Sequence, residues 1–443
     1  MINLIGTVSD YSYEGQGVIK IDGLVYFIKD VLSGEIIEFQ VIKKHKNYGF
    51  GKAIKIIKPS VNREIFRCSY HKCHNCDLKA LNYTEQIKFK KQTLAHTLEK
   101  AKITGNNIEF SANDKPTNYR NKIVLHFKSE KATLALGYFC NKKGDVVPVE
   151  QCWLADERIN AVLTKITLLF KTATLSTYDY QTKKGLLKHL IMRVSHNNEL
   201  LIGVVINSKT INNELRSILN RISNIANVKS VVVNCNTLHN SLLLSPDNRV
   251  ITPNAYIIDE ILGYRFRLSL NSFYQVNTTM LSKLYLKALS LAHLNKDDVV
   301  LDAYCGVGTL SLLLSAKVKK VIGVDIVQEA IIDAKYNKEL NEVNNAIFIC
   351  SDVDEYIRQF NAEINCVFLD PPRSGASESF LKTIIDHKIK SIIYISCNPV
   401  TLARDISLLK AHGYTLENVA GFDLFSYTHH LECVVKLTLN LDK

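Results

Sequence analysis

The stretch VVLDAYCGVGTLSLLLSA, at residues 299–316, decides the fold of the second half of this chain. A short apolar run carries Asp302 near its end, a loop with Gly306 and Gly308 follows, and a second apolar run then begins. The stretch approaches the length of a membrane-spanning helix, but the aspartate and the two glycines favour a strand, a loop and a helix. Glycines in such a loop let the backbone approach a ligand closely at the carboxyl edge of a parallel sheet.

The residues that follow alternate between short apolar runs and a helix-like segment. KKVIGVD, AIFIC, CVFLD and SIIYIS predict strands, and VQEAIIDAKYNKEL predicts a helix. Such alternation, with runs rich in Val and Ile, is typical of a doubly wound, mostly parallel α/β sheet. We therefore expect an α/β domain of the nucleotide-binding type over residues 259–443.

A second acidic residue helps to choose the ligand of this sheet. Asp325 ends the next predicted strand, 17 residues after Gly308, where its carboxylate can accept hydrogen bonds from both ribose hydroxyls of a ligand. A dinucleotide fold uses an acid in the same way, but its G-x-G-x-x-G fingerprint fails because Leu310 and Ser311 follow Thr309. The pattern D-x-x-C-G-x-G with a downstream Asp is closer to the S-adenosylmethionine pocket of class I methyltransferases, with another nucleotide ligand as the alternative.

Two further strand ends carry reactive or polar groups. The motif DPPR at 370–373 follows one predicted strand, and SCNP at 396–399 follows the next. Ligands of open parallel sheets bind at the carboxyl ends of the strands, so we predict that Cys397 is a thiol at the mouth of a site. For the other cysteines of the β-rich segments we predict the ordinary role of a small buried hydrophobe. These are Cys140, Cys235, Cys350, Cys366 and Cys433.

A thiolate suits a methyltransferase that acts on carbon 5 of a uracil. That carbon is a poor nucleophile, but addition of a thiolate to carbon 6 makes an enolate whose carbon 5 can attack a methylsulfonium. A base must then remove the proton of carbon 5 so that the cysteine can leave. Glu432 can supply this base, because it stands where a final strand at 433–437 begins. A surface carboxylate alone would carry no such meaning, and the presence of Cys397 makes Glu432 a candidate.

The N-terminal residues 1–58 predict a small five-stranded β-barrel. Short apolar runs alternate with Gly and Asp turns in LIGTVSDYS, GQGVIKIDG, LVYFIKD, GEIIEFQVIKKH and YGFGKAIKII. Barrels of this size often bind oligonucleotides, and basic residues at 43–46 stand close to Tyr48 and Phe50, which suits phosphate contact with base stacking. Solvated lysines that protect an edge strand are the alternative. Pro59 is expected to begin a linker.

Residues 59–258 predict a central α+β domain. KIVLHF, LALGYF, LIMRVS, LLIGVVI and KSVVVNC are extended runs, and INAVLTKITLLFKTA has helical spacing. A polar helix at about 83–102 precedes them, and packing on the catalytic domain is one of its options. The segment shows no fixed-period repeat.

The start of this central region is rich in cysteine and histidine. Four thiols are able to hold a [4Fe-4S] cluster or zinc, and His71 and His74 keep zinc open. In a cytosolic chain, such cysteines are more often metal ligands or core residues than disulfide partners. The candidate ligands are Cys68, Cys73, Cys76 and Cys152.

Length and charge limit the function classes. The chain has 443 residues, and its 55 Lys and Arg against 43 Asp and Glu give a formal net charge of +12. Such a length predicts about two to four domains, and a hydrophobic fraction of 47% excludes a disordered or fibrous chain. The positive excess favours a polyanionic partner, with a solvated lysine-rich surface as the alternative. The start lacks the basic region of a secretory signal, so we expect a cytoplasmic protein without membrane association.

Taken together, these motifs resemble those of the RNA uracil-5 methyltransferases. DAYCGVGTLSL, GVD, FLDPPRSG, ISCNPVTLARD and FSYTHHLE follow one another in this order, with SFYQVN at 272–277. The N-terminal segment is similar to the TRAM module that many members carry, so the resemblance covers nearly the whole chain. It implies a class I fold, S-adenosylmethionine as methyl donor, RNA as partner, and a monomer that makes 5-methyluridine. It favours 23S ribosomal RNA over tRNA, because the barrel and the cysteine set accompany many ribosomal enzymes.

The resemblance also implies roles for individual residues. Cys397 would be the nucleophile and Glu432 the proton acceptor. The residues that would bind the methyl donor or line the active site are Gln275, Tyr304, Asp325 and Asp370. The family usually has Glu at the position of Asp325 and proline at that of Ser426, and neither change removes a reacting group.

For the cysteines, the resemblance implies a [4Fe-4S] cluster. Several members bind one through C-x5-C-G-G-C, whereas here the first gap is one residue shorter and the glycines are His74 and Asn75. Two other functions remain open from the residues. One is a protein or small-molecule methyltransferase with the same donor pocket, and the other is a non-catalytic RNA-binding factor, which predicts degenerate reacting residues.

Overall fold

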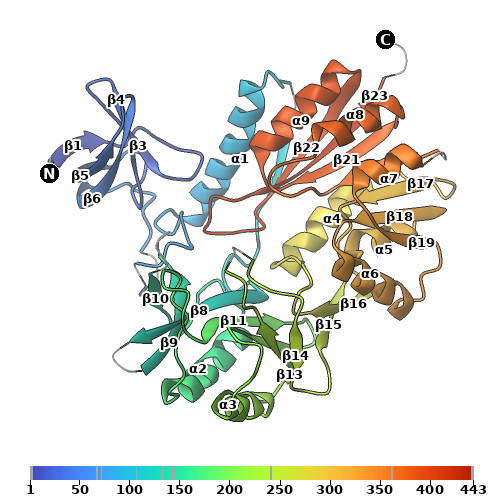
Figure 1. Cartoon of the computed structure of the whole chain (residues 1–443). Coiled ribbons are helices and arrows are strands. Elements are labelled where there is room, and N and C mark those ends of the chain that lie inside the picture. The colour runs from blue at the N-terminus through green and yellow to red at the C-terminus, as the bar shows by residue number, and fades with distance from the viewer. Residues whose placement is uncertain are drawn as a thin grey trace.

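A computed structural model describes residues 3–65, 68–70, 72–105, 107–130, 133–140, 145–239, 242–360 and 363–440. In these residues the strands form three large sheets and one two-stranded hairpin. The N-terminal sheet stands beside the C-terminal sheet, and the central sheet lies below both in the view of Figure 1. Within the described part of the chain, none of the helices combines the length and apolarity that a membrane crossing demands.

The N-terminal sheet contains six strands, one more than predicted. Its strands are β1 (Asn3–Thr7), β2 (Asp10–Tyr11), β3 (Gly17–Ile21), β4 (Leu24–Ile28), β5 (Ile36–Lys44) and β6 (Tyr48–Lys58), in the order β1-β5-β6-β4-β3-β2. The first predicted run divides at Val8 and Ser9, because its start pairs with β5 and its end pairs with β3. The segment 3–11 therefore supplies both β1 and β2, which are the two strands at opposite ends of the order. Buried side chains such as Ile28, Ile37 and Phe39 fill the space inside.

The central sheet contains all five extended runs that the sequence predicted. Its strands are β8 (Lys122–Glu130), β9 (Thr133–Phe139), β10 (Val146–Pro148), β11 (Leu187–Val194), β12 (Leu200–Ile206), β13 (Val228–Cys235) and β14 (Asn248–Val250), in the order β10-β9-β8-β11-β12-β13-β14. The predicted helix is α2 (Glu157–Lys171), which Asp156 caps, and α3 (Asn213–Ser223) was not predicted. Both pack in one core with the sheet. The hairpin of β15 (Tyr256–Ile261) and β16 (Tyr264–Ser269) contributes to the neighbouring core, which residues of β11, β12 and β13 also enter.

The C-terminal sheet is mostly parallel and doubly wound, as predicted. Its strands are β17 (Val299–Ala303), β18 (Lys320–Asp325), β19 (Ala346–Cys350), β20 (Cys366–Leu369), β21 (Ser391–Ser396), β22 (Tyr414–Phe422) and β23 (Glu432–Leu439), with β7 (Ile108–Ser111). The order is β19-β18-β17-β20-β21-β23-β22-β7, and β23 alone runs antiparallel to both of its neighbours. The helices are α4 (Thr278–Ala292), α5 (Thr309–Ser315), α6 (Gln328–Leu340), α7 (Val353–Gln359), α8 (Glu378–Asp386) and α9 (Pro399–Ala411). The opening stretch 299–316 thus forms β17, a loop and α5.

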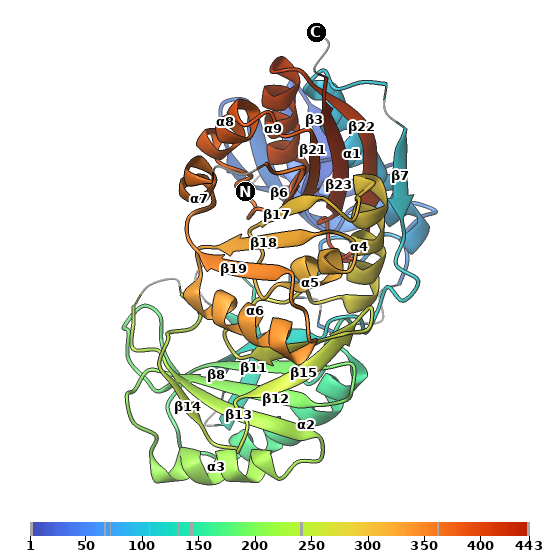
Figure 2. The ribbon, with the colours of Figure 1, turned by 90° about the vertical axis from the view of Figure 1, so that its right-hand side faces the viewer.

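A segment that precedes the central sheet also belongs to this C-terminal sheet. Strand β7 pairs in parallel with β22, with Ile108 opposite Val419, and Figure 2 shows the two strands side by side. Helix α1 (Tyr83–Lys100) begins at its Asn82 cap and buries Leu94 and Leu98 in the core that also contains Val419. The chain therefore builds the edge of the C-terminal sheet before it builds the central one.

The structure corrects the prediction for two of the five cysteines expected in the core. Cys235, Cys366 and Cys433 are buried, but Cys140 is half-buried and Cys350 is exposed. Cys350 is the last residue of β19, which is the outermost strand of its sheet, so solvent reaches it from the open edge. Burial of Cys350 was predicted from its apolar neighbours in the sequence. Its position at the end of an edge strand exposes it instead.

Candidate active site

The sequence-predicted residues of the C-terminal half meet at one edge of the sheet. Tyr304 follows β17, Asp325 ends β18, Asp370 follows β20 and Cys397 follows β21. These four strands are parallel neighbours, so their carboxyl ends lie together. Glu432 begins β23, whose direction is opposite, and therefore lies at the same edge.

The glycine loop after β17 is held by Asp325. One carboxylate oxygen of Asp325 accepts from the backbone N–H of Gly306 at 2.9 Å, and the other accepts from that of Val327 at 2.8 Å. Gly308 adopts φ +81°, and a Cβ there would lie 2.7 Å from the ring of Phe348, so the position requires glycine. Each oxygen of Asp325 keeps a second lone pair for a ligand.

Tyr304 begins this loop, and Gln275 comes from a separate segment of the chain. Tyr304 has φ +65°, and its ring meets the edge of Phe380 with 6.1 Å between ring centroids. Burial raises the pKa of its hydroxyl to about 12, and the charge of Asp352 adds to the effect. Gln275 is half-buried in the segment between β16 and α4, and its backbone carbonyl accepts from Asn121 at 3.0 Å.

The pairing of β21 with β23 brings the proposed nucleophile close to the proposed base. Strands β21 and β23 pair antiparallel and end with Ser396 opposite Cys433. Cys397 directly follows β21 and Glu432 is the first residue of β23, so both lie at the same end of this strand pair, and the charge of Glu432 acts on the Cys397 thiol. Cys397 is half-buried, whereas Glu432 is 2% exposed.

Burial and neighbouring carboxylates hold protons on these groups. Burial raises the pKa of Cys397 to about 11, Glu432 adds to this effect, and the positive charge of Arg373 opposes it. Burial also raises the pKa of Glu432 well above its usual range, with Asp370 adding and Arg373 opposing. Burial alone raises the pKa of Asp370 to about 7. Arg373 was not among the predicted site residues, although it stands in the DPPR motif that drew attention to this strand end.

A comparison with known proteins decides the family. The family model described as tRNA (Uracil-5-)-methyltransferase matches residues 82–440. The chain belongs to the tRNA (uracil-5-)-methyltransferase family.

Relatives match this member of the family over nearly its whole length. A protein of Staphylococcus aureus (strain MSSA476), described as an uncharacterized RNA methyltransferase, is 35% identical over 442 residues, which cover 98% of this chain and 97% of the relative. A protein of Clostridium tetani with the same description is 34% identical over 438 residues, which cover 97% of this chain and 95% of the relative.

A solved structure shares the fold of this family member. Pyrococcus abyssi tRNA (uracil-54, C5)-methyltransferase, in complex with S-adenosyl-L-homocysteine, aligns with a TM-score of 0.81 at 24% identity. The alignment covers 98% of this chain and 99% of that chain. The likeness confirms the predicted class I methyltransferase architecture.

The loop that leads to Glu432 is anchored by α1. The Asp423 carboxylate accepts from Lys90 Nζ and, at 2.6 Å, from the hydroxyl of Tyr83. Lys90 Nζ also donates to the carbonyl of Phe425 at 3.0 Å, and the side chains of Lys90 and Asp423 are 0% and 1% exposed. Sequence reasoning missed this ion pair, because 333 residues separate its partners.

Ser426, where the family usually has proline, takes part in the same anchor. Its hydroxyl donates to Asp423 at 2.7 Å and accepts from the side-chain amide of Asn113 at 3.0 Å. Its carbonyl accepts from the hydroxyl of Tyr119 at 3.1 Å. The serine therefore replaces the stiffness of a proline ring with hydrogen bonds to Asp423 and to the segment between β7 and β8.

The four cysteines lie near the junction between the central sheet and the loop at 423–431, which leads to Glu432 and is called the catalytic loop below. Cys73 and Cys152 pack against the core of the central sheet, and Cys76 packs with Trp153. Burial raises the pKa of Cys76, and the charges of Cys152, Cys73 and Cys68 add to the effect. Among the described residues, however, no group of three or more His, Cys, Asp or Glu side chains is arranged to hold a metal ion. His71, an alternative zinc ligand in the sequence, lies outside the described residues. As placed, the thiols do not fit a metal or cluster, and we derive no chemical step from one.

An open cavity of about 620 Å³ separates the central sheet from the catalytic loop. Basic and aromatic side chains from both sides line it, and His126 stacks on Phe139 with 3.4 Å between ring centroids. Lys122 contributes an amine whose pKa burial lowers to about 7, with Arg193 adding to the effect. The other lining residues that carry imidazole, guanidinium or phenol groups are His74, Arg120, Tyr138, His429 and His430.

Proposed function

We propose that this protein transfers a methyl group from S-adenosylmethionine to carbon 5 of a uridine in RNA. The observation that carries the proposal is the pairing of β21 with β23, which ends with Ser396 opposite Cys433 and so brings Cys397 and Glu432 to one end of the strand pair. A thiolate and a carboxylate that lie side by side can act on carbons 6 and 5 of one pyrimidine ring. Methyl transfer to a protein or a small molecule at this edge would leave Cys397 without a task.

The donor would lie along the carboxyl ends of β17, β18 and β20. Bound there, S-adenosylmethionine supplies an electrophilic methyl group on a sulfonium. Asp325 would accept hydrogen bonds from its ribose hydroxyls with the lone pairs that Gly306 and Val327 leave free. Gln275, Tyr304 and Asp370 would complete the pocket, and the carboxylate of Asp370 would favour the positive charge of the sulfonium.

The reaction would take five steps, and Cys397 and Glu432 would carry out four of them. Cys397 loses its proton to solvent, and the thiolate adds to carbon 6 of the uracil, which moves an electron pair onto the carbon 4 oxygen. Carbon 5 then takes the methyl group, and S-adenosylhomocysteine leaves. The carboxylate of Glu432 accepts the proton of carbon 5, and the bond between carbon 6 and sulfur breaks to return the thiolate.

Two positive charges would favour the anions that these steps require. Arg373 already lowers the pKa of both Cys397 and Glu432. A bound sulfonium would act in the same direction on Glu432, so the carboxylate would form when the donor is present. Without the methyl donor, Cys397 and Glu432 would hold their protons. Binding of the donor would favour the loss of the proton from Glu432.

RNA would enter through the cavity between the central sheet and the catalytic loop. A target base must leave its stack to reach Cys397, and aromatic rings such as the stacked His126 and Phe139 of this cavity favour extruded, single-stranded nucleotides. We propose the N-terminal sheet as a TRAM-like barrel that adds phosphate contacts. The corresponding domain division is 1–58, 59–258 and 259–443, with α1 and β7 of the middle range packed on the catalytic domain. We propose a cytoplasmic monomer as the working unit and no membrane partner.

Among RNAs, we propose 23S ribosomal RNA as the substrate, on the strength of the N-terminal sheet and the cysteine set. The description of the family model supports tRNA as the second candidate. The test is to incubate the protein with labelled S-adenosylmethionine and total RNA that lacks 5-methyluridine, separate 23S RNA from tRNA, and map the labelled nucleotide. Label in tRNA would reject the ribosomal choice, and absence of 5-methyluridine from both would reject the function.

For the cysteine set, we propose that Cys68, Cys73, Cys76 and Cys152 hold a [4Fe-4S] cluster, with zinc as the alternative, after their side chains rearrange from the positions described above. The charges of Cys152, Cys73 and Cys68 all act on Cys76, and this nearness supports the proposal. Anaerobic purification followed by iron, sulfide and zinc analysis tests it. A colourless, iron-free protein would contradict the cluster.

A further inference from the structure

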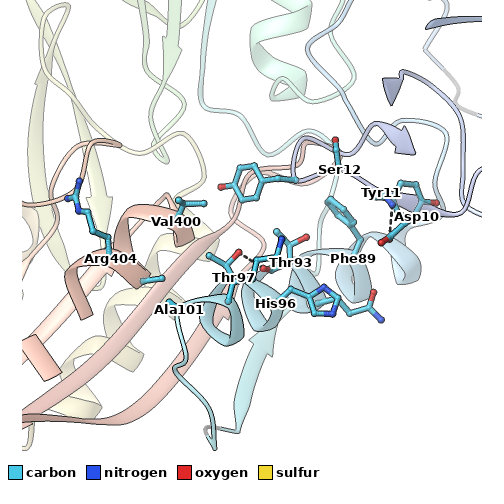
Figure 3. Close-up of a pocket in the computed structure, with 14 residues that line it drawn as sticks. Asp10, Tyr11, Ser12, Phe89, Thr93, His96, Thr97, Ala101, Val400 and Arg404 are labelled. Atoms are coloured by element: carbon cyan, nitrogen blue, oxygen red, sulfur yellow. Dashed lines mark hydrogen bonds between the residues drawn. The ribbon is translucent and has the colours of Figure 1, made fainter. Parts of the chain in front are cut away.

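A second cavity lies where the N-terminal sheet meets the catalytic region. It has a volume of about 530 Å³ and is lined by three elements, namely the segment 10–13, helix α1 and helix α9 (Figure 3). Figure 3 shows Val400 and Arg404 on the α9 side and Asp10 to Ser12 on the opposite side, with α1 between them. A volume of this size accommodates a ligand as large as a nucleotide.

Helix α1 presents one complete face to this cavity. The lining residues of α1 recur at helical spacing, so they form a single stripe along the helix. They are Phe89, Gln92, Thr93, His96, Thr97 and Lys100. Leu94 and Leu98, on another face, enter the core of the C-terminal sheet. Phe89, at one end of the stripe, packs with Leu32, Leu78 and Leu81, and the rest of the stripe is polar or basic.

Tyr13 connects the cavity to the nucleophile. Its hydroxyl donates to the side-chain oxygen of Asn398 at 3.5 Å, and Asn398 directly follows Cys397. The ring of Tyr13 meets His429 edge-on, with 6.1 Å between centroids, and is 39% exposed. Hydrogen bonds within the turn keep the loop compact, because Ser12 N–H donates to Gln16 O at 2.7 Å. The N-terminal sheet thus delivers an accessible aromatic ring to the edge of the catalytic site.

The charges of the cavity suit a phosphodiester. Its lining contains three basic groups, on His96, Lys100 and Arg404, and one carboxylate, on Asp10. Arg404 already donates to Asp405 at 2.7 Å and to backbone carbonyls, which fixes its guanidinium at the rim. Basic groups next to an exposed aromatic ring are the combination that binds a single-stranded nucleotide.

We propose that this cavity is a subsite for a nucleotide adjacent to the target uridine, with Tyr13 as the stacking platform for its base. Lys100, His96 and Arg404 contact the phosphates on the same side. The inference rests on the proposed function, and it gives the N-terminal sheet a positioning role in addition to general attraction for RNA. The neighbouring nucleotide is held while the target base turns toward Cys397.

The test compares variants of the stripe and the loop in the full-length protein. Tyr13→Ala removes the platform, Tyr13→Phe keeps the ring, and the double variant His96→Ala/Lys100→Ala removes two basic groups. Lys91→Ala is the matched control, because Lys91 is an exposed lysine of α1 outside the stripe. The measurements are the KM for unmodified total RNA, the KM for S-adenosylmethionine, and filter binding of the same RNA at several salt concentrations.

For Tyr13→Ala we expect the KM for RNA to rise about tenfold while the KM for S-adenosylmethionine stays the same, and Tyr13→Phe should remain near wild type. The double variant should bind more weakly, with a salt dependence reduced by about one to two phosphate contacts. The Lys91→Ala control should match wild type.

Two results would overturn the subsite. One is equal RNA affinity of wild type, Tyr13→Ala and the double variant. The other is a parallel rise of both KM values in Tyr13→Ala, which would indicate a structural role. A wild-type protein that binds RNA but forms no 5-methyluridine would instead reject the proposed function, and the filter-binding comparison would still decide the subsite.

Discussion

The two halves of the C-terminal sheet are built in different ways. In the parallel half, from β19 to β21, each site residue ends its strand or follows it directly, and a helix comes next in the chain. In the other half, β23 pairs with β22 and β22 with β7, and the loop before β23 is anchored by Lys90 of α1. The first half is local in sequence, whereas the second assembles segments more than 300 residues apart.

The difference separates the two sides of the proposed reaction. The side for the methyl donor depends on short-range geometry, such as the two backbone N–H groups that fix Asp325. The side for the base depends on the arrangement of Glu432 relative to Cys397, which distant segments support. Changes in the second half should therefore impair RNA chemistry while donor binding persists, and the following predictions test this separation in order of expected effect.

The largest effect is expected for Cys397→Ala. Loss of the thiolate removes covalent activation of carbon 6, so methyl transfer should fall by at least about 10⁴-fold. Binding of S-adenosylmethionine, measured by calorimetry, should remain. Methylation at the wild-type rate would exclude the thiolate mechanism, and simultaneous loss of donor binding would show that the donor side and the base side of the site are not separable.

The next effect is expected for Glu432→Gln. Removal of the base should slow turnover by about 10²- to 10⁴-fold and leave RNA attached to Cys397, because the proton of carbon 5 stays in place. A denaturing gel with labelled RNA detects the adduct. Addition of Cys397→Ala to the variant should abolish the shifted band, and a shifted band that persists would assign the attachment to another residue.

A smaller effect is expected when the anchor of the second half is broken. Lys90→Met leaves Asp423 as a buried charge without its cation, which should reduce the free energy of unfolding by about 3 to 5 kcal/mol in urea. Lys90→Met/Asp423→Asn should recover part of this loss, since the lone charge is then gone. Lys91→Met, an exposed neighbour on the same helix, should change stability by less than about 0.5 kcal/mol. An equal loss for Lys91→Met would contradict the anchor.

The smallest effect is a dependence on pH. The raised pKa values of Cys397, at about 11, and of Glu432 mean that both groups must lose protons before they act. Activity should therefore rise with pH, and kcat/KM for RNA at saturating donor should increase by up to about tenfold per pH unit between pH 7 and 9. A flat or falling profile would show that another group controls the thiol.

The sequence predicted the site residues of the parallel half. It did not predict most of the contacts that hold the other half in place. The strand ends at Asp325, Asp370 and Cys397 could be predicted because a parallel sheet places ligands there whatever its neighbours are. The ion pair of Lys90 and Asp423 could not, because no periodicity relates residues that meet through tertiary packing alone. Roles for the site residues remain predictions, since the structure gives their positions and not their chemistry.

In the N-terminal sheet, too, local features could be predicted from the sequence and tertiary contacts could not. Its strands followed from alternating apolar runs, but the division of the first run at Val8 and Ser9 arises from pairing with two different partners. The position of Tyr13 beside Asn398 depends on how two sheets dock, which the local pattern of residues 1–58 does not encode.

The pairing of β7 with β22 has a consequence for synthesis on the ribosome. Strand β7 and helix α1 emerge early, whereas β22 emerges about 300 residues later. At about 5 to 20 residues per second, this interval lasts roughly 15 to 60 s. During that time the apolar face of α1, with Leu94 and Leu98, has no sheet to cover it while the central sheet can already fold. The nascent chain therefore carries an exposed apolar segment until its last strands arrive, and this interval is when a chaperone would have most to bind.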